Sequence, residues 1–195
     1  MQRDLAEKNL SRAELQDLRN KRTGLAVFQI SWILVFVCLV VVNWQLRWSQ
    51  PSWPPPGVQT PPLALPSLGT MGLLVSVWLV RRSVRFIKAD NQAAFLTNWR
   101  IALVLGTAFV VIMIYEWLAI PYSGIYSDVY RLMTGFHGVH ALAIGLFMGM
   151  IDRGARSGHY GPGNFWPVEG AAGLWYFVVV AWLLFYVVLY WWVGI

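Results

Sequence analysis

Five long apolar stretches, each with few charged residues, decide which architecture this chain can adopt. A helix needs about 20 predominantly apolar residues to cross a bilayer. Stretches that meet or approach this length occupy residues 24–46, 67–84, 100–120, 130–151 and 169–193. Charged residues make up only 12% of the 195 residues, about half the share that is usual in soluble domains. The sequence therefore predicts an all-α fold, an integral membrane bundle of five transmembrane helices.

The segments between these stretches are polar or rich in proline. Residues 1–23 are highly charged, and Ser11 and Glu14 have the spacing of a helix capping box. We expect residues 1–23 to include a short surface helix, followed by one five-span membrane domain at residues 24–195. Residues 49–66 hold seven of the ten prolines. Because proline has no amide donor, this segment is predicted to be a loop outside the hydrocarbon.

Lysine and arginine residues are concentrated on one predicted side of the membrane. Thirteen of the fifteen lie in or beside the N-terminal segment, the connection between the second and third stretches, and the connection between the fourth and fifth. Only Arg47 and Arg131 fall on the other side. Short loops rich in lysine and arginine stay in the cytoplasm, which predicts the N-terminus inside and the C-terminus outside. This topology accounts for the net charge of +6, so no nucleic-acid partner is needed.

Two histidines, His137 and His140, lie inside the fourth stretch. An ionisable side chain in hydrocarbon costs roughly 2–3 kcal/mol or more unless it faces protein or water, so both should face other helices. Glu116 in the third stretch lies at a matching depth, since it and His137 are each roughly 8 Å from the outer ends of their spans. We therefore predict a structural polar cluster of Glu116, His137 and His140, in which Glu116 is hydrogen-bonded to His137.

The same histidines could instead bind haem or a metal ion. Residues three apart on a helix project to one side, whereas two axial ligands approach a haem from opposite faces, so His137 and His140 cannot both ligate one haem. A metal site would have to include Glu116 as a third ligand. Cys38 is the only cysteine, which excludes a disulfide framework. Structural hydrogen bonding is favoured, and we predict no catalytic, cofactor-binding or metal-binding residue in this chain.

Glu169 lies at the start of the last stretch, two residues after Pro167. Proline near the first helical position and an acidic residue in the first turn are typical of a helix start. Arg153 and Arg156 lie on the same predicted side of the membrane. An ion pair between Glu169 and one of these arginines is the second interpretation.

Several motifs resemble subunit III of the haem-copper terminal oxidases, which comprise cytochrome c oxidase and its quinol-oxidising relatives. The central motif is Thr134-Gly-Phe-His-Gly-Val-His140, in which Gly135 and Gly138 are small positions. Matches in the same order are Gly106, Phe109, Glu116 and Trp117 in the third stretch, then Val168, Glu169, Trp175 and Tyr190-Trp191-Trp192 in the last. The likeness covers about residue 24 to the C-terminus and favours the short five-helix bacterial form.

Some polar positions of that family pattern are replaced in this chain. The family usually has Ser-Glu in its first shared helix, where this chain has Ser31 and Trp32. Tyr176 and Val179 stand where the last helix usually has a histidine and an aspartate, and Met113 replaces a glutamine. Since the family's glutamate is associated with proton uptake and lipid contact, the resemblance favours assembly and protection of the catalytic subunit over proton collection.

The resemblance implies an activity for a complex and a supporting role for this chain. In the family, subunit I holds the haems and copper that reduce oxygen to water and pump protons, while subunit III binds no redox cofactor. We expect this chain to pack against subunit I, with subunit II, small subunits or a larger respiratory assembly as further partners, in a bacterial cell membrane. Phospholipid is expected between the subunits, and Arg153 and Arg156 are candidate head-group contacts.

Two other classes of protein remain as alternatives. An accessory subunit of a nitric oxide reductase system would share this resemblance and would differ in its catalytic partner. A transporter subunit would be expected to have broken helices or charges at the bilayer midplane. The middle of each predicted span is apolar here, which disfavours the transporter.

Overall fold

The computed structural model describes residues 11–58, 60–121 and 124–192. Within these ranges the chain forms α1 (Arg12–Trp48), α2 (Ala64–Lys88), α3 (Gln92–Ala119), α4 (Ile125–Arg156), α5 (Trp166–Tyr186) and a π-helical extension, η2 (Val187–Trp191). Five of these helices are long and apolar enough to cross a membrane. The predicted all-α fold with five spans is confirmed, and the chain is a multi-pass membrane protein.

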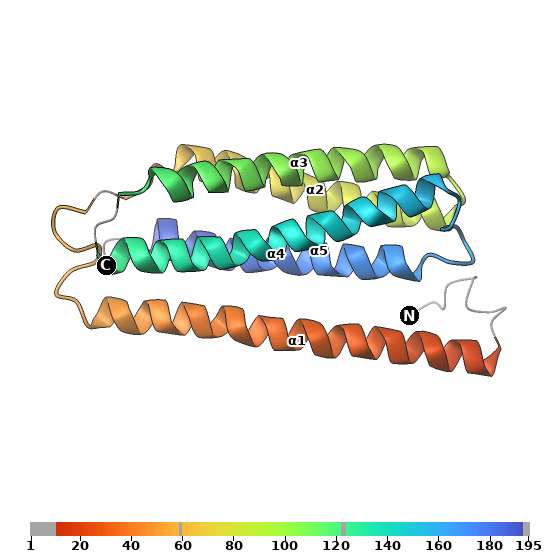
Figure 1. The fold of residues 1–195 in the computed structure, drawn as a ribbon, viewed down its shortest axis with the longest axis horizontal. Helices are drawn as coiled ribbons and strands as arrows, with labels where there is room; N and C mark the ends of the chain where they lie inside the picture. Colours follow the sequence, from red (N-terminus) through yellow and green to blue (C-terminus); the bar gives the residue numbers. More distant parts are fainter. Residues whose placement is uncertain (1–10, 59, 122–123, 193–195) are drawn as a thin grey trace.

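The helices run up and down along the long axis of the molecule (Figure 1). α2 and α3 lie side by side, α4 and α5 form the adjoining layer, and α1 packs on the side of α4 and α5 away from α3. Successive helices are joined at alternate ends of the bundle. We call one end the basic end, formed by the start of α1 and the α2–α3 and α4–α5 connections. The other is the proline-loop end, formed by residues 49–63 and the α3–α4 connection.

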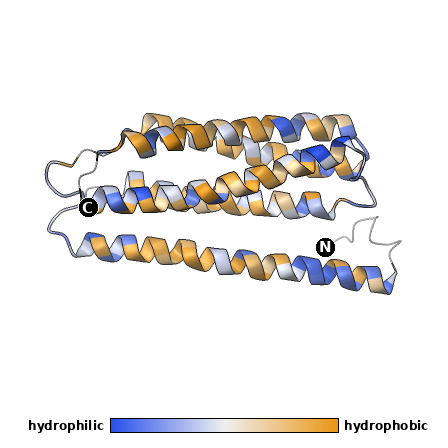
Figure 2. Cartoon of the chain, viewed as in Figure 1, coloured by the Kyte–Doolittle hydropathy of each residue, from blue (hydrophilic) through white to orange (hydrophobic). Residues whose placement is uncertain are grey.

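Every helix extends beyond its predicted span at the basic end. α1 begins at Arg12 and α4 ends at Arg156, so the helices continue through the charged residues that flank the apolar stretches. Figure 2 shows hydrophilic residues gathered at this end of α1, α3 and α4. Within residues 11–23, the described part of the polar segment, the chain is the first part of α1 itself. The predicted capping box is present, with Ser11 and Glu14 exchanging hydrogen bonds of 3.3 and 2.8 Å.

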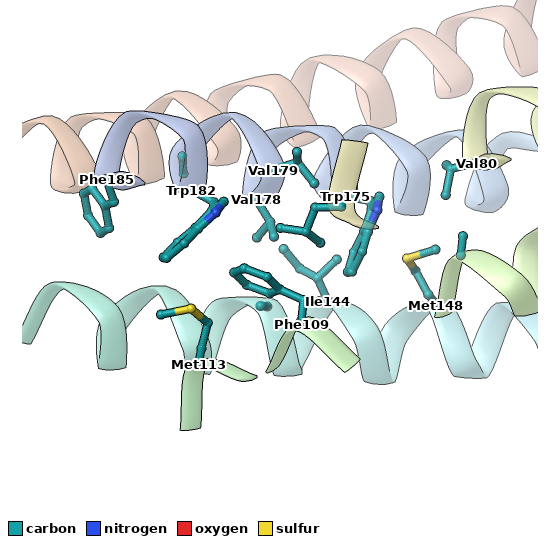
Figure 3. Close-up of a cluster of buried hydrophobic side chains, with 14 of the residues drawn as sticks. Val80, Phe109, Met113, Ile144, Met148, Trp175, Val178, Val179, Trp182 and Phe185 are labelled. Carbon is teal, nitrogen blue, oxygen red and sulfur yellow. The ribbon is translucent and has the colours of Figure 1, made fainter. Parts of the chain in front are cut away.

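The core lies among α2, α3, α4 and α5. Its largest fully buried side chains include Trp99, Trp175 and Trp182, and Figure 3 shows two of these rings beside Phe109, Ile144 and Met148. α1 is attached to this core from outside: within α1 only Phe36 and Asn43 are buried. Phe36 fills the junction, with ring centroids 5.2–5.4 Å from those of His140, Phe177 and Phe185.

Candidate functional site

His137 is fully buried where α3, α4 and α5 meet. Its Nε2 donates to the backbone carbonyl of Val178 on α5, at 3.1 Å, because a carbonyl oxygen only accepts. The rings of Phe109 and Trp182 surround it, with centroids 5.8 and 5.2 Å away. Nδ1 is buried without a hydrogen-bond partner among the described residues. The histidine thus fastens α4 to α5 inside an aromatic cage.

His140 lies one turn further along α4 and faces α1. Its Nδ1 donates to the carbonyl of Phe136 on its own helix, at 2.7 Å, so this bond satisfies the ring locally. The indole of Trp32 meets the imidazole edge to face, with ring centroids 4.4 Å apart. This contact occurs at the position where the family pattern has a glutamate. An aromatic contact therefore joins α1 to α4 where an acid would have faced a histidine.

Glu116 is also buried, with 3% of its surface exposed, but it is not joined to His137. No hydrogen bond between the two occurs in the described parts of the chain, because Nε2 of His137 is turned toward α5. The predicted hydrogen bond between Glu116 and His137 is therefore wrong. The wider structural polar cluster of Glu116, His137 and His140 stays a prediction. Elsewhere in the core, the hydroxyls of Tyr130 and Tyr190 share a hydrogen bond of 2.6 Å.

Two buried indoles of α5 reach polar side chains of α2. Nε1 of Trp175 donates to Oγ of Ser76 at 2.9 Å, and Nε1 of Trp182 donates to Oγ1 of Thr70 at 2.8 Å. Each hydroxyl in turn donates a hydrogen bond to a backbone carbonyl of α2. The result is a pair of donor–acceptor chains across apolar surroundings, where an unsatisfied polar group is costly.

Glycine allows α3 to approach one of these rings. A Cβ added at Gly106 would lie 2.8 Å from Cζ2 of Trp175, a separation that real side chains do not tolerate. The match of Gly106 to the family pattern thus has a physical reason here, since the indole of Trp175 needs the space. Gly106 lets α3 pack against α5 while Trp175 bonds to α2.

Two further indoles, both on α3, donate hydrogen bonds to backbone carbonyls of α4. Near the proline-loop end, Nε1 of Trp117 donates to the carbonyl of Arg131 at 3.0 Å, and Arg131 donates back to the carbonyls of Trp117 and Ile120 at 3.3 and 2.5 Å. Trp117 is in the last turn of α3 and Ile120 is its C-cap, and carbonyls at a helix end have no partner within the helix. Toward the basic end, Nε1 of Trp99 donates to the carbonyl of Met148 at 3.0 Å.

The remaining motif positions of α4 serve local packing. Thr134 is buried and donates to the carbonyl of Tyr130 at 2.7 Å. A Cβ at Gly135 would lie 3.2 Å from Nε1 of Trp117, whereas one at Gly138 would meet nothing within 4 Å. Close helix approach therefore explains Gly135 but not Gly138.

Glu169 joins three helices at the basic end. Its carboxylate accepts from Arg22 on α1 at 3.1 Å and from Lys88 on α2 at 2.7 Å. The ammonium of Lys88 also lies 4.6 Å from the ring centroid of Phe165, the residue before α5. The suggested partners Arg153 and Arg156 are therefore wrong for Glu169, because its carboxylate pairs with Arg22 of α1 and Lys88 of α2.

Asp152 forms the second ionic contact at this end. It accepts from Arg100 on α3 at 2.8 Å and from Arg156, one turn further along α4, at 3.2 Å. Arg156, a candidate lipid contact, thus belongs to an ion pair with its own helix. Arg153 is exposed and makes no ion pair with the described residues.

The residues that bond α5 to α2, Ser76 and Thr70, were missed by sequence reasoning. The sequence carries only a weak signal for them. They are single hydroxyl residues within the apolar helix α2, and their partners are two tryptophans that lie seven residues apart in α5. With regard to metals, the described ranges contain no group of three His, Cys, Asp or Glu residues that could hold an ion. What the arrangement can do with its polar groups is hold helices together.

Comparisons with known proteins identify relatives of this chain. The family model described as cytochrome c oxidase subunit III matches residues 6–194. The chain is similar to cytochrome c oxidase subunit 3 of Thermostichus vulcanus, with 32% identity over 86% of this chain and 85% of that protein. It is also similar to the proteins of that name from Drosophila melanogaster, with 29% identity over 89% and 70%, and Synechocystis, with 25% over 86% and 73%.

Proposed function

The chain belongs to the cytochrome c oxidase subunit III family, and from this premise we propose that it is the non-catalytic subunit III of an aerobic respiratory terminal oxidase. In this proposal the catalytic subunit I carries the haem and copper that reduce oxygen to water, and pumps protons. This chain packs against subunit I within a complex that includes subunit II, and it supports assembly, lipid binding and the stability of the catalytic subunit.

The observation that carries the proposal is the use of polar side chains within the spans. His137 bonds to α5, and the indoles of Trp175 and Trp182 bond to α2, all inside the buried core. A polar group in hydrocarbon is stabilised best when a neighbouring helix satisfies it. These groups therefore hold the helices of the subunit in place. Such an arrangement suits a rigid support for a catalytic neighbour.

The contact between Trp32 and His140 supports the same role. An indole has no acidic proton at physiological pH and its N–H only donates, so Trp32 cannot take up and release protons as a carboxylate can. The junction of α1 with α4 is thus built for packing. This favours assembly and protection of the partner over collection of protons for it.

We place the basic end in the cytoplasm and the proline-loop end outside, in a bacterial inner membrane, because Lys and Arg are concentrated at the basic end. Ser52 and Ser157 are exposed residues of the two opposite ends. In a Cys38→Ser background, a membrane-impermeant maleimide applied to intact cells should label the Ser52→Cys variant and spare the Ser157→Cys variant. Labelling of Ser157→Cys alone would reverse the orientation.

Co-purification tests the proposed function. The tagged full chain is extracted from its native membranes in mild detergent, and its partners, visible absorption spectrum and oxygen consumption are recorded beside an untagged control. We expect haem-containing subunits that consume oxygen. A preparation without any haem-containing partner would contradict the proposal, and a partner that reduces nitric oxide but not oxygen would favour the alternative system.

A further inference from the structure

One face of α2 presents basic residues next to α5 at the basic end. Lys88 on this face contacts Glu169 at the start of α5. Arg81 and Arg85 precede Lys88 by seven and three positions, so they share its face of the helix. α2 and α5 run in opposite directions (Figure 1), and Tyr176 follows Glu169 by seven positions. Arg81, Arg85 and Tyr176 therefore lie at similar depth, and we call them the arginine–tyrosine site.

The arginine–tyrosine site has two cations but no acid of its own. Arg81 and Arg85 are exposed and Tyr176 is half-buried. None of the three makes a hydrogen bond or an ion pair with another described residue. Glu169, the one acid of α5, is already held by two other cations. Within the described part of the chain, both guanidinium groups thus lack a carboxylate.

The depth of Arg81 makes the missing acid significant. Arg81 lies inside the predicted span, seven residues or about 10 Å before the end of α2. Arg100 lies at comparable depth, eight residues or roughly 12 Å after the start of α3, and Asp152 accepts from it at 2.8 Å. Arg82 stacks on two aromatic rings of its own helix, with centroids 4.7 and 5.4 Å away. Since cations within a span pair with an opposite charge, Arg81 indicates an acid from another chain.

An apolar strip continues from this site along α5 toward the proline-loop end. It consists of Val180, Leu184 and Val187, which are exposed by 65%, 39% and 49%. Their spacing of three or four residues is that of positions at which one helix packs on another. α1 packs on one side of the strip through Phe177, and α2 bonds to Tyr186 on the other. A helix seated between α1 and α2 would cover the strip and reach the arginines.

We propose that the arginine–tyrosine site and the apolar strip together dock a transmembrane helix of a partner subunit. An aspartate or glutamate of that helix pairs with Arg81 and Arg85 and accepts a hydrogen bond from the hydroxyl of Tyr176. A carboxylate suits the site because each of its two oxygens can accept from a guanidinium. The inference rests on the proposed function, which makes this chain part of a complex, and it adds where a partner is held and by which charge.

Carbodiimide coupling in the purified complex tests the contact. R81K and R85K keep the positive charge and supply an amine, which a water-soluble carbodiimide joins to a carboxylate in direct contact. R19K is the matched control, because Arg19 is exposed at the same end of the bundle. We expect position 81 or 85 to be joined to an acid of another subunit at least about tenfold more often than position 19, since a carboxylate held in contact reacts as an intramolecular neighbour.

Mass spectrometry of the coupled peptides decides the outcome. Coupling at positions 81 and 85 that is no more frequent than at position 19 overturns the proposal, as does coupling only to acids of this chain. A partner without haem that couples at position 81 or 85 would contradict the proposed function and still support this docking surface. Haem-containing partners without such coupling would do the reverse.

Charge reversal distinguishes a protein acid from a lipid phosphate. R81E and R85E should each lower the amount of co-purified partner at least about tenfold, because like charges at an interface strongly disfavour association, whereas R19E should retain it. Unchanged partner with less phospholipid per chain would assign the arginines to lipid and overturn the proposal. Thermal midpoints identify a reversed variant that fails to fold, in which case the coupling of R81K and R85K decides.

Discussion

The indole of Trp32 on α1 stands edge to face against the imidazole of His140 on α4, with the ring planes at 88°. Phe36, one turn along α1, contacts the same imidazole from the next position, at 5.4 Å between centroids. Both rings belong to the contact between α1 and α4. The junction is aromatic at the place where the family pattern has an acid.

Replacing Trp32 with alanine should loosen α1. An aromatic pair contributes about 0.5–1.5 kcal/mol beyond its buried area, so we expect W32A to lower the free energy of unfolding by more than about 1 kcal/mol in a denaturation series in detergent. W48A is the matched control, because Trp48 lies on the same helix and is 77% exposed. Equal stability of W32A and W48A would show that the contact with His140 does not hold α1.

Gly106 should tolerate no larger residue. Because an added Cβ would lie 2.8 Å from the ring of Trp175, G106A should cost about 1–3 kcal/mol through overpacking and reduce recovery of folded chain. G145A provides the control: its Cβ would meet nothing within 4 Å, and alanine favours the helix by about 1 kcal/mol over glycine. A neutral G106A would mean that Trp175 can move aside.

Glu116 and His137 should behave independently. His137 bonds to Val178 and makes no hydrogen bond to Glu116, so the changes in unfolding free energy of E116Q and H137N should add in the double variant to within about 0.5 kcal/mol. The measurement is a double-mutant cycle by denaturation in mixed micelles. A coupling energy above about 1 kcal/mol would restore the direct pair that the sequence suggested.

Glu169 should stabilise the basic end in a salt-dependent way. Because its carboxylate joins Arg22 and Lys88 and is only 26% exposed, E169Q should lower the thermal midpoint more than D17N, whose pair with Lys21 lies on the surface of one helix. The expected loss is at most about 1 kcal/mol, and it should shrink in high salt. A midpoint that falls equally in both variants would assign no special role to the three-helix contact.

The sequence predicts the spans well because the hydrocarbon requires long apolar helices, and their number follows from length and hydropathy. The helix ends were less predictable, since arginines such as Arg85 and Arg156 continue the helix beyond the apolar stretch. Charge marks where the hydrocarbon ends, whereas backbone hydrogen bonding decides where the helix ends.

Pairings between helices were the least predictable part of the candidate site. Matching depth placed Glu116 and His137 at one level, but depth leaves rotation about each helix axis open, and His137 turns to α5. Ser76 and Thr70 became acceptors for Trp175 and Trp182 only because α2 neighbours α5. Which helices are neighbours depends on the packing of the whole bundle, and no local motif contains that information.

Haem and copper content before and after removal of this chain tests the central claim most directly. The purified oxidase complex is stripped of the chain by detergent, and both fractions are assayed for haem, copper and oxygen consumption. A supporting subunit predicts that all haem and copper stay with the remaining subunits, which still reduce oxygen at first and lose activity sooner during turnover than the intact complex. Haem or copper that leaves with this chain would contradict the account.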